Sequence, residues 1–377
     1  MTVENPQFLL WVALTVLVSW VMPRRQLPAL LSLSCAGFLG IYAPISLLSL
    51  TGITLVVGLA LINGKGRHGL VLSAIAICGA VFVGYRLWSA APEELGVIGL
   101  LGFAFYVLRA IHLLLESYSG RLVALSWQEL IAYLWFLPTL QVGPIHRFQP
   151  FQRDLFRRRW DSEAFSQGLR RILWGYVKIV VLANYLVNNK YASWIGALDP
   201  DSWWYHYLDT LQYGLNLYFK FAGYSDIAIG FALMLGFRVM ENFNFPYLAR
   251  DISDFWRRWH ISLSSWCRDY VYMPVFSITR VPALAAIATM LVLGLWHELS
   301  LRYLLWGIWH GAGIAICQRW QRSEAAQSLN KGPLAAVWAP FAAFVTLNFV
   351  ILSFVITGAE SISAMLDRWQ VLLGIAP

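Results

Sequence analysis

Charged residues are scarce in this sequence. They make up 13% of its 377 residues, against roughly a quarter in an ordinary soluble domain. Hydrophobic residues make up 59%, nineteen residues are tryptophan, and the mean hydropathy is +0.59. This composition excludes a typical soluble protein and predicts an all-α polytopic membrane protein. The net charge of +8 does not indicate nucleic-acid binding, because Lys and Arg lie in short clusters between apolar runs, as the positive-inside rule predicts.

Cysteines and several catalytic motifs are also few or missing. Cys35, Cys78, Cys267 and Cys317 show no C-x-x-C or zinc spacing, so we expect neither a disulfide framework nor a metal site. No G-x-S-x-G elbow is present, which argues against a Ser-His-Asp hydrolase. The N-terminus lacks a basic region and a small-residue cleavage site, so the first apolar run is expected to be a retained span. Without a linker or solenoid repeat, one integral-membrane domain over 1–377 is predicted.

Roughly ten apolar segments are expected to be transmembrane or re-entrant helices. The basic loops at 24–25 and 64–68 indicate the cytoplasmic side, and the acidic turn at 90–94 indicates the outer side. Pro138, Gly143 and Pro144 predict that the 128–145 segment is broken. The segments cover residues 8–22, 27–41, 44–62, 69–85, 96–117, 128–145, 167–188, 207–236, 281–299, 303–317 and 335–357, followed by a short amphipathic tail at 360–377.

A polar stripe interrupts the 96–117 segment. Arg109, His112 and Glu116 recur at helical spacing on one face. Ionisable groups inside a membrane usually face a bundle interior or a wet cavity. Two interpretations stay open here, a self-satisfied Arg–Glu pair and a role facing the substrate. Asp226, in the body of the 207–236 segment, is a further candidate for lining a substrate or ion path.

The most basic stretch runs from residue 146 to residue 160, with aromatic side chains between its cations. It is typical of a cytoplasmic loop lying on anionic lipid. The functional alternative is a docking surface for a phosphate-bearing donor such as coenzyme A, or for an acidic carrier protein. Its basic residues are His146, Arg147, Arg153, Arg157, Arg158 and Arg159.

The stretch from Asp254 to Tyr272 is predicted to form one amphipathic helix. Its apolar face carries Phe255 and Trp259, and its polar face is rich in arginine and serine. Ser253 is expected to cap it, and Pro274 is expected to end it. Such a helix is either an interfacial anchor or a support that places His260 beside a catalytic centre.

Two more histidines flank the turn at 300–302. His297 lies shortly before this turn and His310 about eight residues after it, so an antiparallel helical hairpin would bring them to within about one turn in depth. The imidazole is the side chain whose ordinary pKa lies nearest neutrality, which suits a general base. A lone buried histidine is often structural, but two in one hairpin favour chemistry.

Several motifs resemble those of the membrane-bound O-acyltransferase family, in particular its bacterial branch of alginate O-acetylation and teichoic-acid D-alanylation membrane proteins. The resemblance runs from about residue 97 to 360, whereas residues 1–95 are less specific. The motifs are Asp254-Phe-Trp-Arg-Arg-Trp-His-Ile-Ser-Leu-Ser-Ser-Trp266, Arg268-Asp-Tyr-Val-Tyr272, Phe221-Ala-Gly-Tyr-Ser-Asp-Ile-Ala-Ile-Gly230, Glu241-Asn-Phe-Asn-Phe-Pro-Tyr247, Leu137-Pro-Thr-Leu-Gln-Val-Gly-Pro-Ile-His-Arg147, Gly294-Leu-Trp-His297 and Trp306-Gly-Ile-Trp-His-Gly311.

This resemblance implies a ring of helices around a central tunnel. The family's invariant histidine falls on His297 as the base for the acceptor hydroxyl, its second polar position falls on His260, and the bacterial-branch histidine falls on His310. Three departures concern the acceptor: Glu298 replaces the usual glycine, Met273-Pro-Val-Phe276 replaces a Gly-Gly-Asn-Arg sequence, and the chain ends sooner than alginate-type members.

The function expected from this resemblance is the transfer of an acyl group, most simply acetyl from acetyl-CoA, to a hydroxyl of a cell-surface polysaccharide or of a separate extracytoplasmic transferase. The expected location is the bacterial cytoplasmic membrane, in contact with lipid, with no bound cofactor and no nucleic acid. D-alanyl transfer from a carrier protein, a transporter or flippase, and a non-catalytic scaffold are the alternatives. The substrate-binding candidates are Arg109, Glu116, Asp226, Trp256, Arg257, Trp259, Ser262, Trp296 and Glu298.

Overall fold

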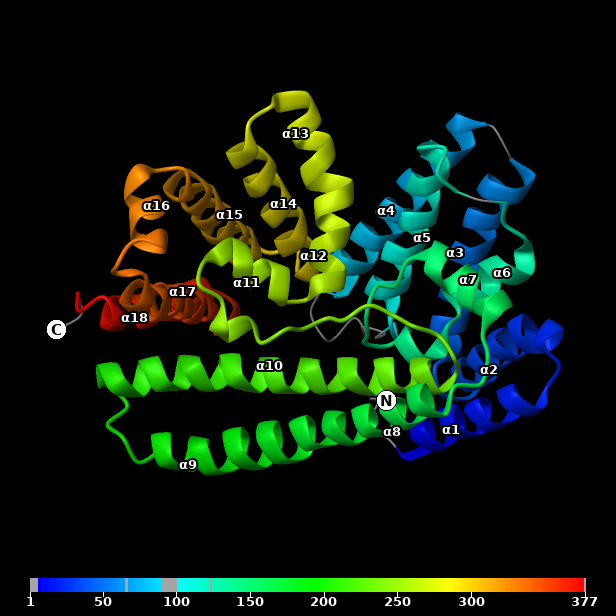
Figure 1. Cartoon of the computed structure of the whole chain (residues 1–377), viewed down its shortest axis with the longest axis horizontal. Coiled ribbons are helices and arrows are strands. Elements are labelled where there is room, and N and C mark those ends of the chain that lie inside the picture. The colour runs from blue at the N-terminus through cyan, green and yellow to red at the C-terminus, as the bar shows by residue number, and fades with distance from the viewer. Residues whose placement is uncertain (1–5, 65–66, 90–99, 123, 376–377) are drawn as a thin grey trace. The chain divides into compact units, whose positions relative to one another are not determined.

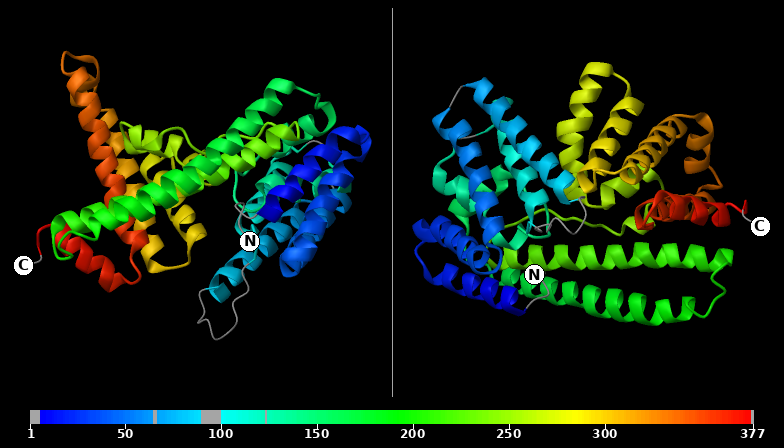
Figure 2. Two further views of the ribbon diagram at one scale, coloured as in Figure 1. Left: turned by 90° about the horizontal axis from the view of Figure 1, so that it is seen from below. Right: turned by 180° about the vertical axis from the view of Figure 1, so that it is seen from behind.

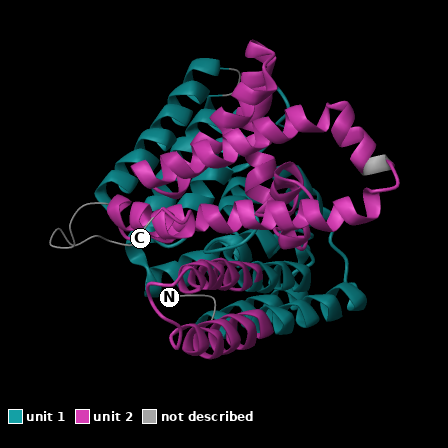
Figure 3. Cartoon of the chain, turned by 90° about the vertical axis from the view of Figure 1, so that its left-hand side faces the viewer, with its two compact units in different colours: residues 1–176, 223–241 teal, residues 177–222, 242–377 magenta. Residues whose placement is uncertain are grey.

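The computed structural model describes residues 6–64, 67–89, 100–122 and 124–375, and these residues form helices and loops with no strand (Figure 1). This confirms the expected all-α class. The chain divides into two compact units, coloured separately in Figure 3. Unit 1 comprises Met1–Tyr176 and Gly223–Glu241, and unit 2 comprises Val177–Ala222 and Asn242–Pro377. The single domain over 1–377 stays a prediction, and the acidic turn predicted at 90–94 lies outside the described residues.

Unit 1 begins with four apolar helices that match the predicted runs. Prolines stand in the first turns of three of them, at Pro6, Pro28 and Pro44, where the missing N–H is not needed for a helical hydrogen bond. The 128–145 segment is broken as predicted, because helix ends at Leu134 and resumes only at Phe148. The helices of this part are α1 (Pro6–Val21), α2 (Leu27–Tyr42), α3 (Pro44–Gly58), α4 (His68–Ser89), α5 (Phe103–Tyr118), α6 (Trp127–Leu134), α7 (Phe148–Arg157) and α8 (Ser162–Tyr176).

Among the described residues, three helical segments are long and apolar enough to cross a membrane, namely Pro44–Asn63, His68–Ser89 and Ala335–Gly358, and Pro6–Val21 and Pro282–His297 are shorter apolar helices. The predicted ring around a tunnel stays a prediction.

Glycines let α8 pack closely against the C-terminal part of α10 (Trp203–Met234) within unit 1. A Cβ atom at Gly168 would lie 2.7 Å from the carbonyl oxygen of Gly230, and one at Gly175 would lie 2.7 Å from that of Gly223. Figure 2 shows these two segments running side by side. Beyond α8 the chain continues as a wider π-type helix (Val177–Tyr191) and the short α9 (Ala192–Ile195) before reaching α10.

The predicted continuous helix over 254–272 is wrong. The chain instead forms α11 (Ile252–Arg258) and α12 (Ile261–Cys267), separated by His260 in the left-handed region at φ 43°, and then a π-type turn (Arg268–Tyr272). The cap of α11 is Asp251 rather than Ser253, because the Asp251 side chain accepts a hydrogen bond from the Asp254 N–H at 2.7 Å. Pro274 does not end the helix. It stands in the first turn of α13 (Met273–Thr279), where a proline fits.

The predicted hairpin of His297 and His310 is confirmed. It consists of α14 (Pro282–His297) and α15 (Leu301–Gln321), and the Ser300 side chain caps α15 by accepting from the Tyr303 N–H. Glycines line the hairpin interface: a Cβ at Gly307 would lie 2.7 Å from the Met290 carbonyl oxygen, and one at Gly311 would lie 2.8 Å from Ile287 Cα. The remaining helices of unit 2 are α16 (Glu324–Lys331), α17 (Ala335–Gly358) and α18 (Ile362–Leu372).

Candidate active site

Three histidines predicted from the sequence line one cavity of unit 2. His260, His297 and His310 surround a space of about 110 Å³ whose other walls are almost entirely aromatic and aliphatic. They come from three different elements, the α11–α12 break, the end of α14 and the middle of α15. The other lining residues are Tyr213, Leu217, Phe221, Phe255, Trp256, Trp259, Tyr303, Trp306, Val350, Phe354 and Thr357.

His297 is the last residue of α14 and is the most open of the three, since its side chain is only half-buried. Its ring stacks on Tyr303 at 5.8 Å between centroids and meets the edge of Trp306 at 5.8 Å. The next residue, Glu298, is not part of the cavity wall. It caps the end of α14 and forms an ion pair with Arg302 at 3.3 Å.

His260 is held by an unusual backbone conformation. A left-handed conformation costs roughly 1–2 kcal/mol in a residue with a Cβ, so neighbouring contacts must stabilise it. Asn242 provides them: its carbonyl oxygen accepts from the Ile261 N–H at 2.9 Å, and its side-chain oxygen accepts from the Ser262 hydroxyl at 2.6 Å. Ser262 is fully buried, and its hydroxyl helps to hold the backbone beside His260 through Asn242. Asn242 belongs to a motif seen in the sequence, but sequence reasoning did not give it this role.

Aromatic rings surround the His260 side chain. Phe221 meets it at 4.6 Å between ring centroids, and Trp296 lies 6.1 Å away while also contacting His297 at 4.8 Å. His260 lies in the break between two short helices, outside the apolar spans. Burial, with a smaller effect of the neighbouring His297, holds the pKa of His260 well below its ordinary value. A neutral imidazole carries one donor nitrogen and one acceptor nitrogen.

His310 is fixed by partners on both ring nitrogens. The indole N–H of Trp256 donates to His310 Nδ1 at 3.3 Å, and His310 Nε2 lies 3.0 Å from the Ser353 hydroxyl oxygen. Because an indole nitrogen can only donate, the hydrogen bonds assign the proton of the neutral ring to Nε2. The Ser353 hydroxyl oxygen accepts the hydrogen bond from this N–H, and the Ser353 hydroxyl donates to the Val350 carbonyl oxygen at 2.6 Å. His310 thus orients Trp256 in the cavity wall.

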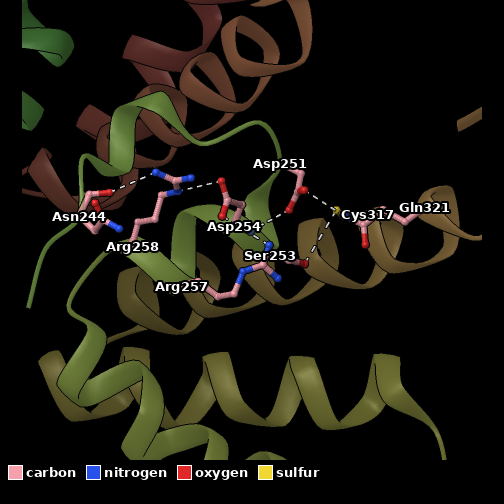
Figure 4. Close-up of polar contacts among 8 residues, drawn as sticks. All are labelled: Asn244, Asp251, Ser253, Asp254, Arg257, Arg258, Cys317 and Gln321. Carbon is pink, nitrogen blue, oxygen red and sulfur yellow. Dashed lines mark hydrogen bonds and ion pairs between the residues drawn. The ribbon is translucent and has the colours of Figure 1, made fainter. Parts of the chain in front are cut away.

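A polar network attaches α11 to α15 (Figure 4). Asp251 accepts from the Gln321 side chain at 3.0 Å, and the Ser253 hydroxyl lies 3.9 Å from the Cys317 sulfur. Asp254 pairs with Arg258 at 2.8 Å and with Arg257 at 3.4 Å. The Asp251–Gln321 and Ser253–Cys317 contacts join the helix that carries Trp256 to the helix that carries His310, whereas the Asp254 ion pairs lie within α11.

A second, larger cavity of unit 2 lies on the other side of Trp256. It has a volume of about 370 Å³ and is lined mostly by apolar surface, including Ile261 and Ile314, with hydroxyl groups and two exposed arginines, Arg257 and Arg268, at its wall. Gln318 lies in its wall and also in the wall of a third cavity of about 460 Å³ that carries Arg319 and Arg322. Two of the four arginines are ion-paired, Arg257 with Asp254 at 3.4 Å and Arg268 with Asp269 at 2.9 Å, so the positive character of these spaces rests mainly on Arg319 and Arg322.

The polar stripe of α5 lies in unit 1 and does not line the histidine cavity. Glu116 pairs with Arg121 at 2.7 Å, so the Arg–Glu pair proposed from the stripe is made by a different arginine. His112 Nε2 accepts from the Phe148 N–H at 3.2 Å. Arg109 is completely buried, and one of its nitrogens lies 3.4 Å from the Tyr133 carbonyl oxygen.

The other candidates of unit 1 also have structural partners. Asp226 accepts from Arg171 at 2.7 Å, and Arg171 also binds Glu241, which connects α8, α10 and the following loop. In the basic stretch 146–160, Arg158 is buried over the Trp20 ring at 4.2 Å and donates to the Leu235 carbonyl at 2.8 Å. Part of this stretch therefore stabilises unit 1 and is not free for a ligand.

Known proteins are similar to this chain in sequence. The model of the membrane-bound O-acyltransferase family matches residues 7–359. A "Probable alginate O-acetylase" of Pseudomonas aeruginosa is 36% identical over 280 residues, covering 72% of this chain and 51% of that protein. A teichoic acid D-alanyltransferase of Streptococcus thermophilus is 30% identical over 286 residues, covering 69% and 68%. A peptidoglycan O-acetyltransferase of Helicobacter pylori is 26% identical over 323 residues, covering 77% and 59%.

The chain spans about half the length of the alginate O-acetylases it matches. The family match nevertheless covers nearly all of the chain and includes the three elements that carry His260, His297 and His310. The chain therefore belongs to the membrane-bound O-acyltransferase family.

Proposed function

We propose that this protein transfers a short acyl group from a thioester to a hydroxyl acceptor, with His297 as general base. The observation that carries the proposal is the cavity shared by His260, His297 and His310, one wall of which adjoins an arginine-lined cavity. The histidines that would catalyse the reaction and the site that would bind an anionic donor then lie on the two sides of one side chain, Trp256. The names of the relatives support the same class of reaction.

The chemistry needs one base and one group that stabilises negative charge. His297 accepts the proton of the attacking hydroxyl as its oxygen bonds to the thioester carbonyl carbon. The carbon–sulfur bond then breaks, the ester is released, and the departing thiolate takes the proton back from His297. His260, neutral and close to His297, is suited to hydrogen-bond the carbonyl oxygen as negative charge develops on it.

The donor would be an anionic thioester such as acetyl-CoA. Its phosphates match Arg319 and Arg322, together with the ion-paired Arg257 and Arg268, which line two neighbouring cavities that share Gln318. The thioester end would then point toward Trp256 and the histidines. This assigns donor binding to unit 2 instead of to the basic stretch 146–160.

A fourth cavity of unit 2 provides a possible binding site for the acceptor. It has a volume of about 230 Å³, and it shares Tyr213 and Phe354 with the histidine cavity. Amide and carboxylate groups such as those of Asn188, Asn216 and Asp209 line it, and these groups bind hydroxyls well. An acceptor carrying hydroxyls, either a cell-envelope polysaccharide or the hydroxyl of a separate transferase, fits this side. The family and the apolar helices support a location in the bacterial cytoplasmic membrane.

The donor assignment predicts a specific kinetic change. Replacing Arg319 and Arg322 together by Gln should raise the KM for acetyl-CoA about 30-fold and leave kcat nearly unchanged, because two charge-assisted contacts of roughly 1 kcal/mol each are lost away from the reacting atoms. The measurement is release of free coenzyme A by purified protein in lipid. Arg170→Gln is the matched control, since Arg170 is an exposed arginine of unit 1 paired with Glu163.

Transfer of radiolabel tests the reaction class and the identity of the donor. Radiolabel should move from acetyl-CoA to a hydroxyl acceptor in membranes that contain the protein. If acetyl-CoA is inert but an alanyl thioester on a carrier protein is consumed, the donor is carrier-bound, as suggested by the teichoic acid D-alanyltransferase relatives. If neither donor is consumed and no acceptor is labelled, the proposed function is wrong.

A further inference from the structure

The fourth cavity of unit 2 contains an acid and a base that neutralise each other. It measures about 230 Å³ and adjoins the histidine cavity, with which it shares Tyr213 and Phe354. Asp209 of α10 and Arg368 of α18 both line it and form an ion pair at 2.8 Å. The wall is therefore rich in hydrogen-bonding groups and, over its described residues, carries no net charge. Its uncharged polar residues, apart from Tyr213, are Asn188, Thr210, Gln212 and Asn216.

The packing of α18 holds the ion pair in place. Trp369 of α18 meets the edge of Trp309 of α15 at 5.0 Å between ring centroids. At the other end of the helix, the Trp203 indole N–H at the start of α10 donates to the Leu372 carbonyl oxygen at 3.0 Å. The two side chains of the ion pair are only 28% and 31% exposed, so water screens their charges only in part.

The other groups of this wall suit a sugar ring. The Asn188 amide donates to the Asn216 side-chain oxygen at 3.1 Å, and an amide side chain can make further hydrogen bonds to vicinal hydroxyls. Tyr213 and Phe354, in edge contact at 5.9 Å, supply aromatic surface for the apolar face of a ring. Since a cavity of ~150 Å³ in another protein accepts benzene, a cavity of about 230 Å³ has room for one ring with its hydroxyls.

An anionic sugar would meet a different environment from an uncharged one. Its carboxylate could bind Arg368 only by displacing Asp209, which would then lose its partner in a partly buried site. If the ion pair stayed intact, the ligand carboxylate would be repelled by the Asp209 carboxylate. Hydroxyls meet neither problem, because they can hydrogen-bond to both members of the pair without separating them.

We propose that the Asp209–Arg368 pair selects an uncharged sugar residue as the acceptor and rejects sugars that carry a carboxylate. This inference rests on the proposed function, because the sugar hydroxyl must react with a thioester at His297. It also favours direct transfer to carbohydrate over transfer to the hydroxyl of a separate transferase. The bound ring presents that hydroxyl at the side of the cavity formed by Tyr213 and Phe354, next to the histidines.

The test uses two matched pairs of acceptors, methyl glucoside with methyl glucuronide and methyl galactoside with methyl galacturonide. The members of each pair differ in one hydroxymethyl group, which is a carboxylate in the second. Purified protein in lipid transfers label from acetyl-CoA, or from a carrier-bound thioester if that is the donor consumed. Wild-type protein should prefer the uncharged member of at least one pair by at least ~10-fold in kcat/KM.

The two halves of the ion pair should change this preference in opposite directions. Asp209→Asn leaves Arg368 without its acid and should shift the ratio of kcat/KM values at least ~10-fold toward the carboxylated sugar. Arg368→Gln leaves the Asp209 carboxylate and should retain or increase the preference for the uncharged sugar. The double variant should lie between wild type and Asp209→Asn. A loss of folded protein would lower both acceptors equally and leave the ratio unchanged.

Asp367→Asn is the matched control, since Asp367 is the exposed acid next to Arg368 on α18 and does not line the cavity. Equal use of both members of a pair by wild-type protein, or an unchanged ratio in Asp209→Asn, would overturn the inference while transfer remains. Label on a protein hydroxyl with no glycoside labelled would also overturn it. Absence of any His297-dependent thioester cleavage would instead remove the proposed function together with this inference.

Discussion

Replacing His297 by Ala is expected to lower acyl transfer by ~10²–10⁴-fold, the contribution that a positioned general base usually makes. The structural reason is that His297 is the half-buried histidine of the cavity, at the open end of α14, and it has an aromatic wall on both sides. Its replacement removes the group that can take the hydroxyl proton. His260 and Trp296 keep their positions because Asn242 and the packing of α12 hold them.

The measurement is transfer of label from acetyl-CoA, or from a carrier-bound thioester, by purified protein in lipid. Melting temperature should change little, because His297 ends its helix and does not hold the hairpin together. His68→Ala is the matched control, since His68 is an exposed histidine at the start of α4 in unit 1. A His297→Ala protein that is folded and retains full transfer would show that another group is the base.

The hairpin was predictable because its signals are local. The apolar runs on both sides of residues 300–302 predict two helices, and Ser300 followed by helix formers provides an N-cap. Once the two helices pair, the heights of His297 and His310 follow from the rise per residue. The family resemblance then indicated that His260 belongs to the same centre, although it lies about forty residues earlier in the chain.

The break at His260 could not be predicted from helical periodicity. Read locally, residues 254–272 form a convincing amphipathic pattern. The break is stabilised by hydrogen bonds to residues distant in the sequence. Asn242 accepts from the Ile261 N–H and from the Ser262 hydroxyl, and the Asn244 N–H donates to the Arg258 carbonyl at 3.0 Å. Tertiary hydrogen bonds of this kind break a helix that the periodicity of apolar residues predicts to be continuous.

Charged residues in apolar surroundings were the least predictable. Arg158 looks like one more cation in a basic loop, but it is buried over Trp20, 138 positions earlier, and against the Leu235 carbonyl. Glu116 pairs with Arg121 outside the stripe that drew attention to it. A sequence reveals that such groups need partners, but the choice among partners depends on packing between distant helices.

The second large effect is expected from Gly307→Val, which should destabilise unit 2 by at least ~1–3 kcal/mol, the usual cost of overpacking a tight core. A Cβ at Gly307 would lie 2.7 Å from the Met290 carbonyl oxygen and 3.1 Å from Leu291 Cα, and neither is a flexible side chain that could move away. The two extra methyl groups of Val add to that conflict. Small residues at such helix contacts let backbones approach closely.

The expected result is a lower melting temperature in detergent and a loss of acyl transfer, because separating α14 from α15 separates His297 from His310. Gly79→Val is the matched control. Gly79 lies in α4, and a Cβ there would meet no heavy atom within 4 Å, so the same change should be nearly neutral. Gly307→Ala should fall between the two, because its smaller conflict is partly offset by the better helix propensity of Ala. If Gly307→Val melts at the same temperature as Gly79→Val, the close packing of α14 on α15 does not hold the two histidines in one cavity, and their shared site must depend on α11 and α17 instead.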